Sequence, residues 1–419
     1  MKNGVPNNSG FLRLRRYEEP LEDGICRRDE FQRDRDRIMH SRAFRRMMHK
    51  TQIFNANMGD HYRNRLTHTL EVSQIARSIG KALELNDELI EAIALGHDLG
   101  HTPFGHIGEQ ILHEILMNGE VSKYLKISQG FKHNYQSLRV VDELESRCSL
   151  YSGLNLTLAV REGVLKHTST FDKKSRGLIV FPEADFTYID LQAPSFTFEG
   201  QVVALADEIA QCTHDLEDGV RSGIITFDTI RKDPFVAQII NESGISLNEN
   251  TKTPTYDTRS LIIKTMVGYF IKDACTESYK MMDNYLRNHS PKYSCQRDCV
   301  NSKCIMLSSE VETARKRIYD EMIVNRVICS EKISISDAKS EYIIKQLFKA
   351  FFSHPRQLPD YVLDKYCRRK GITLNRATIE VESLQADPQF IRTICDHISG
   401  MTDQFAAREY IRLYVPEYK

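Results

Sequence analysis

The chain has 419 residues, and its 57 Lys and Arg residues balance its 57 Asp and Glu residues, so the formal net charge is zero. This balance excludes an overall basic field that would demand a nucleic acid or an anionic membrane as partner, and any polyanion must be bound by a local surface. The longest apolar stretch, residues 261–271, is shorter than the roughly 18 residues that cross a bilayer, and residues 1–20 lack the apolar segment of a secretory signal. We therefore expect a cytoplasmic protein with no membrane partner.

Apolar residues recur at helical spacing along most of the chain, which predicts an all-α, mainly helical fold with a minor β element. The minor β element is predicted at residues 177–190. Asp87 is the expected N-cap of one helix and Gly219 the expected C-terminal signal of another. Helices are predicted at residues 31–50, 65–83, 87–102, 200–220, 259–287, 309–328, 337–353 and 359–370. In the helix at 65–83, the inward stripe is predicted to contain Leu66, His68, Leu70, Val72, Ile75, Ile79 and Ala82.

The first of these helices lies in a locally basic region. Residues 27–50 contain nine Lys or Arg residues and four Asp or Glu residues. A solvated helix face and an anion-binding surface are both consistent with such a run. The sequence leaves these two interpretations open.

Ten cysteines in a chain without a secretory signal indicate reduced thiols rather than a disulfide framework. The one cluster contains Cys295, Cys299 and Cys304, with His289 upstream. Its spacing departs from the usual zinc-ligand patterns, so we expect buried or surface thiols here.

The stretch "LGHDLGHTPFGHIGE", residues 95–109, is rich in groups that can bind metals or protons. His97 and Asp98 lie near a predicted helix end, while His68 and Asp207 point inward from two other predicted helices. A lone buried His or Asp is more often a hydrogen-bonded core residue or a cap. Together, however, the four offer a mixed nitrogen and oxygen ligand set suited to a divalent metal ion such as Mn, Mg, Fe, Co or Zn.

The order H…HD…D, carried by His68, His97, Asp98 and Asp207, resembles the HD-domain phosphohydrolase superfamily. The surrounding motifs resemble its deoxyguanosine triphosphate triphosphohydrolase (dGTPase) family in sequence and in order, from about residue 10 to the C-terminus. These motifs are "RDRDRIMHSRAFRRM", "KTQIF", "RLTHTLEVSQIARSI", "HDLGHTPFGHIGE", "FKHNYQSLRV", "GLNLT", "LKH", "ADEIAQCTHDLEDG" and "GMTDQFA". The resemblance implies an HD-domain fold and metal-dependent hydrolysis of a deoxynucleoside triphosphate (dNTP) to deoxynucleoside and triphosphate.

We expect the chain to divide into an N-terminal extension (1–30), an HD catalytic core (31–228), an insertion with connecting helices (229–310) and a C-terminal helical region packed on the core (311–419). The insertion around 229–258 and the cysteine segment 289–304 are the parts least similar to the family.

The proposed reaction also needs a proton carrier. His106 and Glu109 are three residues apart, so a helix beginning after Gly105 would place them on one face, where Glu109 can orient the imidazole. We expect His106 to be the general acid/base and His101 to contact phosphate or water. The resemblance supports the His106 and Glu109 pair more strongly than His101.

No G-x-x-x-x-G-K-[ST] loop occurs, so single side chains must bind the triphosphate. The expected substrate contacts are Arg65, His133 and Asn134, with Arg45, Arg46 and Lys50 as weaker candidates. Asp215, two helical turns after Asp207, is expected to bind a sugar hydroxyl. One turn after Asp207 stands Gln211, where related hydrolases commonly carry a Tyr that packs on the sugar; this departure puts the sugar and base preference in doubt.

Two other functions remain open. The same metal site can act on another nucleotide, or the chain can be a nucleotide- or single-stranded-DNA-binding regulator with vestigial activity. Relatives form hexamers or tetramers, and some respond to nucleotide activators or single-stranded DNA. We therefore expect a homo-oligomer, and a nucleotide activator or single-stranded DNA as partners in addition to the dNTP substrate.

Overall fold

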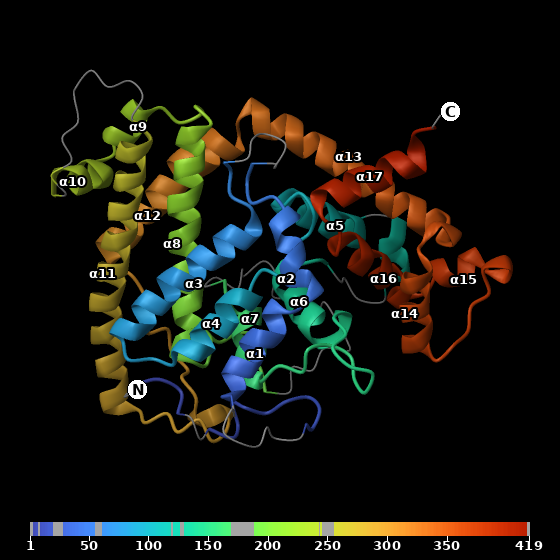
Figure 1. Ribbon diagram of the computed structural model, residues 1–419, viewed down its shortest axis with the longest axis horizontal. Coiled ribbons are helices and arrows are strands. Elements are labelled where there is room, and N and C mark those ends of the chain that lie inside the picture. Colours follow the sequence, from blue (N-terminus) through green and yellow to red (C-terminus); the bar gives the residue numbers. More distant parts are fainter. Residues whose placement is uncertain are drawn as a thin grey trace.

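A computed structural model describes residues 3–6, 9–19, 28–54, 61–118, 120–125, 130–168, 188–242, 244 and 255–416. The prediction of a mainly helical fold is confirmed (Figure 1). In the described part of the chain, β pairing is limited to isolated bridges between Thr51 and Asn64 and between Ser146 and Gly153. The predicted β element at 177–190 falls mostly outside the described residues. Among the described helices, none combines the length and apolar character needed to cross a membrane.

The α-helices are α1 (Glu30–Met39), α2 (Arg42–Arg46), α3 (Arg65–Ala82), α4 (Asp87–Gly96), α5 (His106–Asn118), α6 (His133–Arg139), α7 (Leu158–Leu165), α8 (Phe198–Arg221), α9 (Phe227–Arg231), α10 (Pro234–Glu242), α11 (Tyr256–Asn288), α12 (Ser309–Ile318), α13 (Glu331–Ser353), α14 (Asp360–Lys370), α15 (Val381–Gln385), α16 (Pro388–Ser399) and α17 (Asp403–Tyr414). The described residues also form two π-helices, η4 (Val140–Leu144) and η7 (Tyr319–Ile328). Short 3₁₀ helices are η1 (Met47–His49), η3 (Glu120–Tyr124), η6 (Gln296–Asp298), η8 (Pro355–Gln357) and η9 (Arg376–Thr378).

Two predicted helices differ from the observed ones. The helix expected at 31–50 is broken, because the Ser41 side chain accepts the Phe44 N–H and starts a new helix. The helix expected at 87–102 ends at Gly96, which leaves His97 and Asp98 in the following turn. Its N-cap is Asn86, whose side chain accepts the Leu89 N–H, so the assignment of Asp87 was wrong by one residue.

Two further details of the helix predictions were wrong. Gly219 does not end α8 but lies inside it, where a Cβ would come within 2.7 Å of side-chain atoms of Ile225 and Val327. Gly219 therefore allows Ile225 and Val327 to pack closely against α8. Leu70 is 51% exposed and Ala82 is also exposed, so neither belongs to the inward stripe of α3, whereas Val72, Ile75 and Ile79 are buried.

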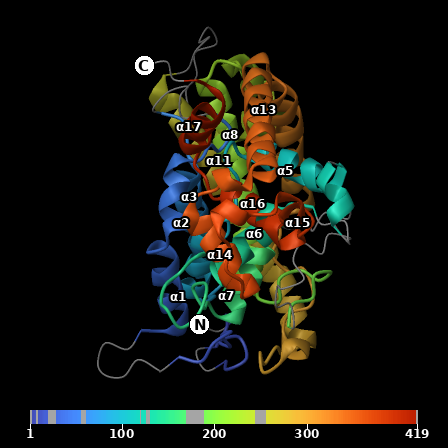
Figure 2. The same ribbon diagram turned by 90° about the vertical axis from the view of Figure 1, so that its right-hand side faces the viewer.

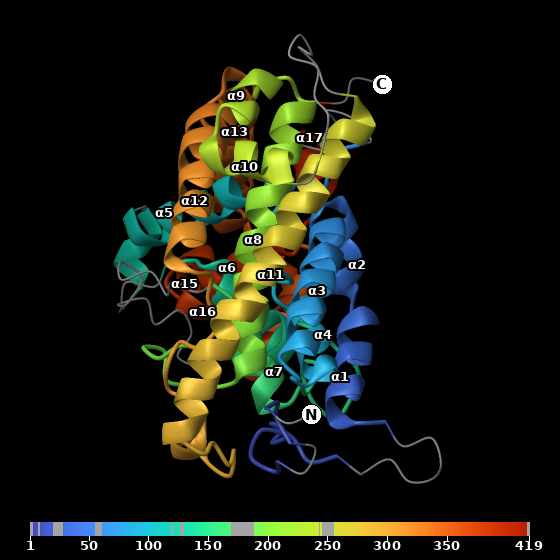
Figure 3. The same ribbon diagram turned by 90° about the vertical axis from the view of Figure 1, so that its left-hand side faces the viewer.

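The buried apolar residues form two clusters. The first joins α1, α3, α4, α7, α8, α11 and α12, and it includes Val5 and Leu12 from the N-terminal segment. The second joins α5 with α13, α14, α16 and α17. In Figure 1 these groups occupy the left and right parts of the molecule; Figure 2 faces the second group, and Figure 3 shows α3, α8 and α11 side by side in the first. The first cluster crosses the predicted domain boundaries at residues 31 and 311, since it contains both Val5 and Ile323. The division of the chain into domains stays a prediction.

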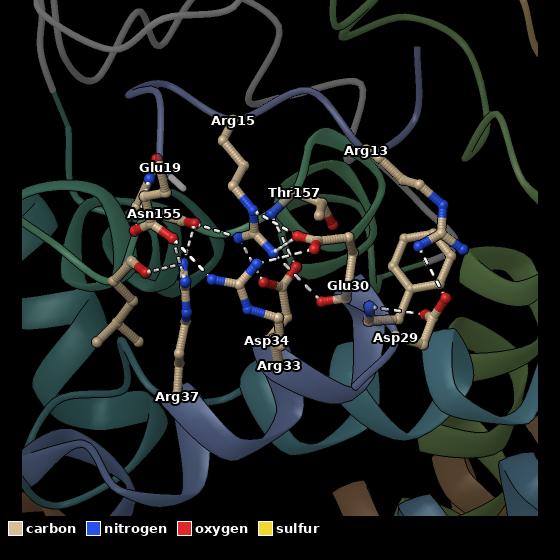
Figure 4. A network of polar contacts seen from close by, with 12 residues as sticks. Arg13, Arg15, Glu19, Asp29, Glu30, Arg33, Asp34, Arg37, Asn155 and Thr157 are labelled. Carbon is tan, nitrogen blue, oxygen red and sulfur yellow. Dashed lines mark hydrogen bonds and ion pairs between the residues drawn. The ribbon is translucent and has the colours of Figure 1, made fainter. Parts of the chain in front are cut away.

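Two arginines of α1, Arg33 and Arg37, are bound by carboxylates of the same protein (Figure 4). Arg33 pairs with Glu19 and Glu30, and Arg37 pairs with Glu19. Arg15, from the N-terminal segment, bonds Glu30 and Asp34. This network fastens the N-terminal segment to α1 and neutralises much of the positive charge that the sequence placed there. Neither open interpretation therefore applies to Arg33 and Arg37, whereas Arg42 and Arg45 of the same region are exposed, and both interpretations stay open for them.

Candidate active site

Three helices bring the four predicted ligand residues together. His68 lies on the buried face of α3, His97 is the C-cap of α4 with Asp98 beside it, and Asp207 lies on α8. His68 Nε2 is 3.0 Å from Asp207 Oδ1, and His97 Nε2 is 3.8 Å from the same oxygen and 3.5 Å from Asp98 Oδ1. Ligand atoms of His68, His97 and Asp98 all lie within 4.8 Å of one another.

The hydrogen bonds of His97 make it suitable for binding a cation. Its Nδ1 lies 2.7 Å from the Ala94 carbonyl oxygen, which can only accept, so Nδ1 carries the proton. Nε2 is therefore a lone pair; it is buried and has no hydrogen-bond partner in the described part of the protein. A carbonyl that fixes the tautomer of a ligand imidazole is typical of metal sites. This unpaired nitrogen, beside two carboxylates and a second imidazole, fits a divalent cation.

Both carboxylates are held in the ionised form. Burial raises the pKa of Asp207, but the hydrogen bond from His68 and the nearby imidazoles outweigh burial and bring the pKa down to about 2. Burial likewise acts to raise the pKa of Asp98, yet the adjacent imidazoles of His101 and His97 and the Arg65 guanidinium hold it well below its usual range. Arg65 Nη1 donates to Asp98 Oδ2 at 2.7 Å, and His101 Nε2 lies 3.1 Å from Oδ1.

The predicted helix after Gly105 is confirmed, since α5 begins at His106. The turn before it is strained, because Phe104 has φ of +63°, a conformation that residues other than glycine rarely adopt. Asp403, in the motif "GMTDQFA", accepts the Phe104 N–H at 2.8 Å and the Thr51 N–H at 2.7 Å. The sequence offered no local signal for this contact.

Glu109 lies between two imidazoles. Its Oε2 is 2.7 Å from His133 Nδ1 and 3.9 Å from His106 Nδ1, so its hydrogen bond goes to His133. Burial acts to raise the pKa of Glu109, but the surrounding histidines, His133 first, hold it well below its usual range. The side chain of His106 is 60% exposed at the entrance of the site. The spacing in the sequence identified His106, the exposed neighbour of Glu109, but did not identify His133 as its buried hydrogen-bond partner.

His167, from the motif "LKH", is a member of the site that the sequence analysis did not single out. Its Nε2 lies 3.2 Å from His133 Nε2 and 3.9 Å from Asp98 Oδ1. Its Nδ1 is 2.7 Å from the Val164 carbonyl, as in His97. Burial, followed by the adjacent imidazoles of His97 and His133, lowers the pKa of His167 to about 3, so the ring is neutral. Only the presence of "LKH" among the family-like motifs indicated it.

The expected phosphate contacts have different surroundings. Arg65 is buried and keeps Nε and Nη2 without partners within the described residues, so it can bind phosphate oxygens. Asn134 instead holds the segment around His167, through the Leu165 carbonyl and the Thr168 hydroxyl.

The three weaker candidates are engaged elsewhere. Lys50 is buried and donates to the carbonyls of His101 and Ser399. Arg45 is exposed and bonds the His40 carbonyl. Arg46 lies 3.7 Å from Glu145 and lines a separate cavity of about 940 Å³ with Tyr361 and Lys365.

The sugar-side candidates lie along α8. Asp215 is buried, and its Oδ2 has no partner in the described structure. Burial, then the charge of Asp218, raises the pKa of Asp215 well above its usual range. Gln211 Nε2 donates to the hydroxyl of Tyr319 in η7 at 3.3 Å, a second residue that the sequence analysis missed.

The cysteine segment contains no metal-ligand grouping among the described residues. Cys295 is exposed, while Cys299 and Cys304 are buried and free. Burial raises the pKa of Cys299 to about 12 and that of Cys304 to about 11, so both are thiols.

Comparison with known proteins agrees with this geometry. Two family models match the chain, the HD domain at residues 65–211 and the phosphohydrolase-associated domain at residues 305–412. A deoxyguanosinetriphosphate triphosphohydrolase-like protein of Geobacter metallireducens is 37% identical over 416 residues, which cover 99% of this chain and 95% of that protein. A protein of the same name from Rhizobium leguminosarum is 36% identical, and the match covers 94% of this chain and 91% of that protein. Another, from Bordetella pertussis, is 37% identical, and the match covers 96% of this chain and 93% of that protein. The chain belongs to the deoxyguanosinetriphosphate triphosphohydrolase-like family of HD-domain phosphohydrolases.

Proposed function

We propose that this protein hydrolyses deoxynucleoside triphosphates to deoxynucleoside and intact triphosphate, with a divalent cation bound by His68, His97, Asp98 and Asp207. The observation that carries the proposal is the buried, unpaired Nε2 of His97, next to two carboxylates that remain ionised. Manganese and magnesium suit this mixed nitrogen and oxygen set, as do other first-row metals. When bound, the cation supplies Lewis-acid stabilisation of phosphate charge and a site for the attacking water.

The chain's own residues provide the remaining functions. Arg65 holds Asp98 with one guanidinium nitrogen and keeps two other nitrogens for phosphate oxygens. His101 and His133 stack, with ring centroids 3.9 Å apart, and close the buried side of the site. Cleavage between the α-phosphorus and the 5′ oxygen leaves an alkoxide that needs a proton. His106 is the exposed imidazole at the entrance, and it delivers that proton with Glu109 behind it.

A regulator that binds single-stranded DNA is less well supported. The basic region that motivated this alternative places Arg33 and Arg37 in ion pairs with Glu19 and Glu30. These charges are not available to follow a phosphate backbone. We therefore keep the nucleotide hydrolase as the proposed function, with a dNTP as substrate and a homo-oligomer, a hexamer or tetramer, as the working assembly.

Product analysis tests the reaction. The purified protein is incubated with each dNTP and with GTP, with Mn²⁺ or Mg²⁺, and the products are separated by ion-exchange chromatography. Inorganic triphosphate together with deoxynucleoside supports the proposal. Pyrophosphate or monophosphate would show cleavage at another bond, and the absence of any product across the panel, also with added nucleotides as activators, would count against a hydrolase of this type.

A further inference from the structure

A cavity of about 940 Å³ lies between α2 and the helices α14, α16 and α17, and none of the four proposed cation ligands lines it. Six cationic side chains and four carboxylates line this cavity. The cations are Arg42, Arg46, Lys365, Arg368, Arg369 and Arg408. Because the cations outnumber the carboxylates, the cavity attracts an anion, and the carboxylates favour an anion that also carries an ammonium group.

Two residues of the lining indicate the kind of ligand that this cavity suits. Burial lowers the pKa of Lys365 to about 8, and the nearby charge of Arg369 adds to this effect, so an anion beside Lys365 would stabilise its charged form. His397 is buried, and its Nε2 has no hydrogen-bond partner among the described residues. An unpaired buried nitrogen is costly, and an amide group of a ligand can pair with it. A short peptide with carboxylates, amides and an ammonium group therefore suits the lining better than a phosphate does.

The free thiol of Cys148 also lines the cavity. Cys148 lies in the loop 146–153, whose ends form an isolated bridge, and the ring of Tyr151 in this loop stacks on Tyr17 with centroids 5.0 Å apart. Desolvation acts to raise the pKa of Cys148, but hydrogen bonds from the loop backbone and from Tyr151, together with the Arg147 charge, outweigh it and lower the pKa. A larger thiolate fraction at an accessible position makes a cysteine more reactive towards disulfides.

We propose that Cys148 is a modification site that forms a mixed disulfide with glutathione or a similar small carboxylated thiol, whose peptide part occupies the cavity. The thiolate of Cys148 attacks one sulfur of glutathione disulfide, a bond forms between these two sulfurs, and the disulfide bond of the reagent breaks. Cys148 is oxidised, and one glutathione is released in reduced form and takes up the proton that Cys148 lost. The carboxylates of the attached glutathione are expected to contact the cations of the cavity.

The cavity also adjoins the turn that carries two of the proposed cation ligands. Leu99 and Gly100, the two residues after Asp98, are part of its lining. Gly100 is tightly packed, since a Cβ there would come within 2.1 Å of the Ser137 nitrogen. The Ser137 hydroxyl accepts the Gly100 N–H at 2.9 Å and donates to the His97 carbonyl at 2.7 Å. We therefore expect the mixed disulfide to displace this turn and slow hydrolysis. This effect rests on the proposed function, whereas the modification itself does not.

Mass spectrometry of the reduced, full-length protein after incubation with glutathione disulfide tests the site. The rate of modification at Cys148 is compared with the rate at Cys329, an exposed free thiol that does not line the cavity. The same ratio of rates is measured with neutral bis(2-hydroxyethyl) disulfide and with cationic cystamine. The ratio is expected to be about tenfold larger with glutathione disulfide than with the neutral reagent, and smallest with cystamine. Equal ratios with all three reagents would overturn the role of the cavity, and the absence of modification at Cys148 would overturn the site.

Variants separate the cavity from the net charge of the protein. The double change Arg368→Ala and Arg408→Ala removes two cations of the lining and should lower the rate of glutathione addition at Cys148 about tenfold, without altering the rate at Cys329. The matched control is Lys264→Ala with Lys349→Ala, which removes the same charge at two exposed positions outside the lining. An equal loss in the control would show that overall charge attracts the reagent and would overturn the inference.

Turnover tests the effect on the proposed reaction. Triphosphate release from dGTP is measured before modification, after modification and after reduction with dithiothreitol. Modification is expected to lower the rate about tenfold or more, and reduction to restore it. Cys148→Ser should retain the wild-type rate and lose the response to glutathione disulfide. An unchanged rate in fully modified protein would overturn the coupling to the turn. Absence of hydrolysis by the unmodified protein would contradict the proposed function, while the mass-spectrometric result would still decide whether Cys148 is a modification site.

Discussion

The carboxylate of Asp403, the first residue of α17, accepts the backbone N–H of Phe104 at 2.8 Å. Phe104 lies two residues before His106, and its φ of +63° strains the turn. The second carboxylate oxygen accepts the Thr51 N–H and hydroxyl. A residue near the end of the chain thus joins the turn that carries His101 and His106 to the segment after η1.

Replacing Asp403 with Ala should therefore affect both stability and catalysis. The change leaves the buried N–H groups of Phe104 and Thr51 without an acceptor, which costs on the order of 2–4 kcal/mol in free energy of unfolding. The strained turn at Phe104 also relaxes, which displaces His106, and kcat is therefore expected to fall. Urea denaturation measures the first effect and steady-state kinetics the second. Asp228→Ala, at an exposed ion pair, should leave the stability close to that of the wild type. Equal effects of the two changes would show that Asp403 is an ordinary surface carboxylate.

Metal content tests the ligand set without reference to activity. Asp98→Ala and Asp207→Ala each remove a carboxylate from the cluster around His97, and each should abolish stoichiometric Mn²⁺ binding. Bound metal is measured by elemental analysis after dialysis and by calorimetric titration. Asp215→Asn is the control, since Asp215 lies two turns further along α8 and its Oδ2 has no hydrogen-bond partner in the described structure. Full metal occupancy in Asp98→Ala would remove that residue from the site.

Helical periodicity predicted that His68 and Asp207 face inward, and the resemblance to the H…HD…D order grouped them with His97 and Asp98. The apolar stripe of α3 orients His68 inward, and the buried length of α8 does the same for Asp207. These patterns are local, and because helical geometry fixes where each side chain points, they predict side-chain direction reliably. The convergence of three helices on one point then follows from packing their apolar faces.

Contacts between distant segments could not be predicted in this way. Asp403 is 299 residues from Phe104, and no periodicity relates them. Glu109 has the i+3 spacing to His106, yet its hydrogen bond goes to His133, because α6 packs a second imidazole closer to the carboxylate. Tyr319 begins a π-helix, whose altered spacing no apolar pattern indicated.

His106→Ala should reduce kcat by about 10² to 10⁴ while leaving metal content unchanged, since it removes an exposed proton carrier and no ligand of the cluster. Rates and bound Mn²⁺ are measured on the same preparations. Gln110→Ala, at an exposed position four residues further along α5, serves as the control and should retain the wild-type rate. Loss of metal in His106→Ala would instead place this imidazole among the ligands.

The pH dependence of stability should depend on His397, a buried residue of α16 packed against the rings of Phe351 and Tyr361. Burial lowers the pKa of His397 to about 4, and the carboxylate of Glu409 opposes this only in part. In the unfolded chain the pKa is about 6.5, so between pH 6.5 and 4 the unfolded chain takes up a proton that the folded protein does not. Stability is therefore fully present above pH 6.5 and falls as the pH is lowered through this window, by up to about 3 kcal/mol from this residue.

His397→Leu should reduce the slope of unfolding free energy against pH by up to about 1.4 kcal/mol per pH unit within that window, because the leucine takes up no proton in either state. Urea denaturation at pH 4.5, 5.5, 6.5 and 7.5 measures the slope. The matched change at the exposed His49 is the control and should leave the wild-type slope intact. Parallel curves for the wild type and His397→Leu would mean that His397 is protonated equally in the folded and unfolded chain. Its surroundings in α16 would then have to admit water, in conflict with its burial against two aromatic rings.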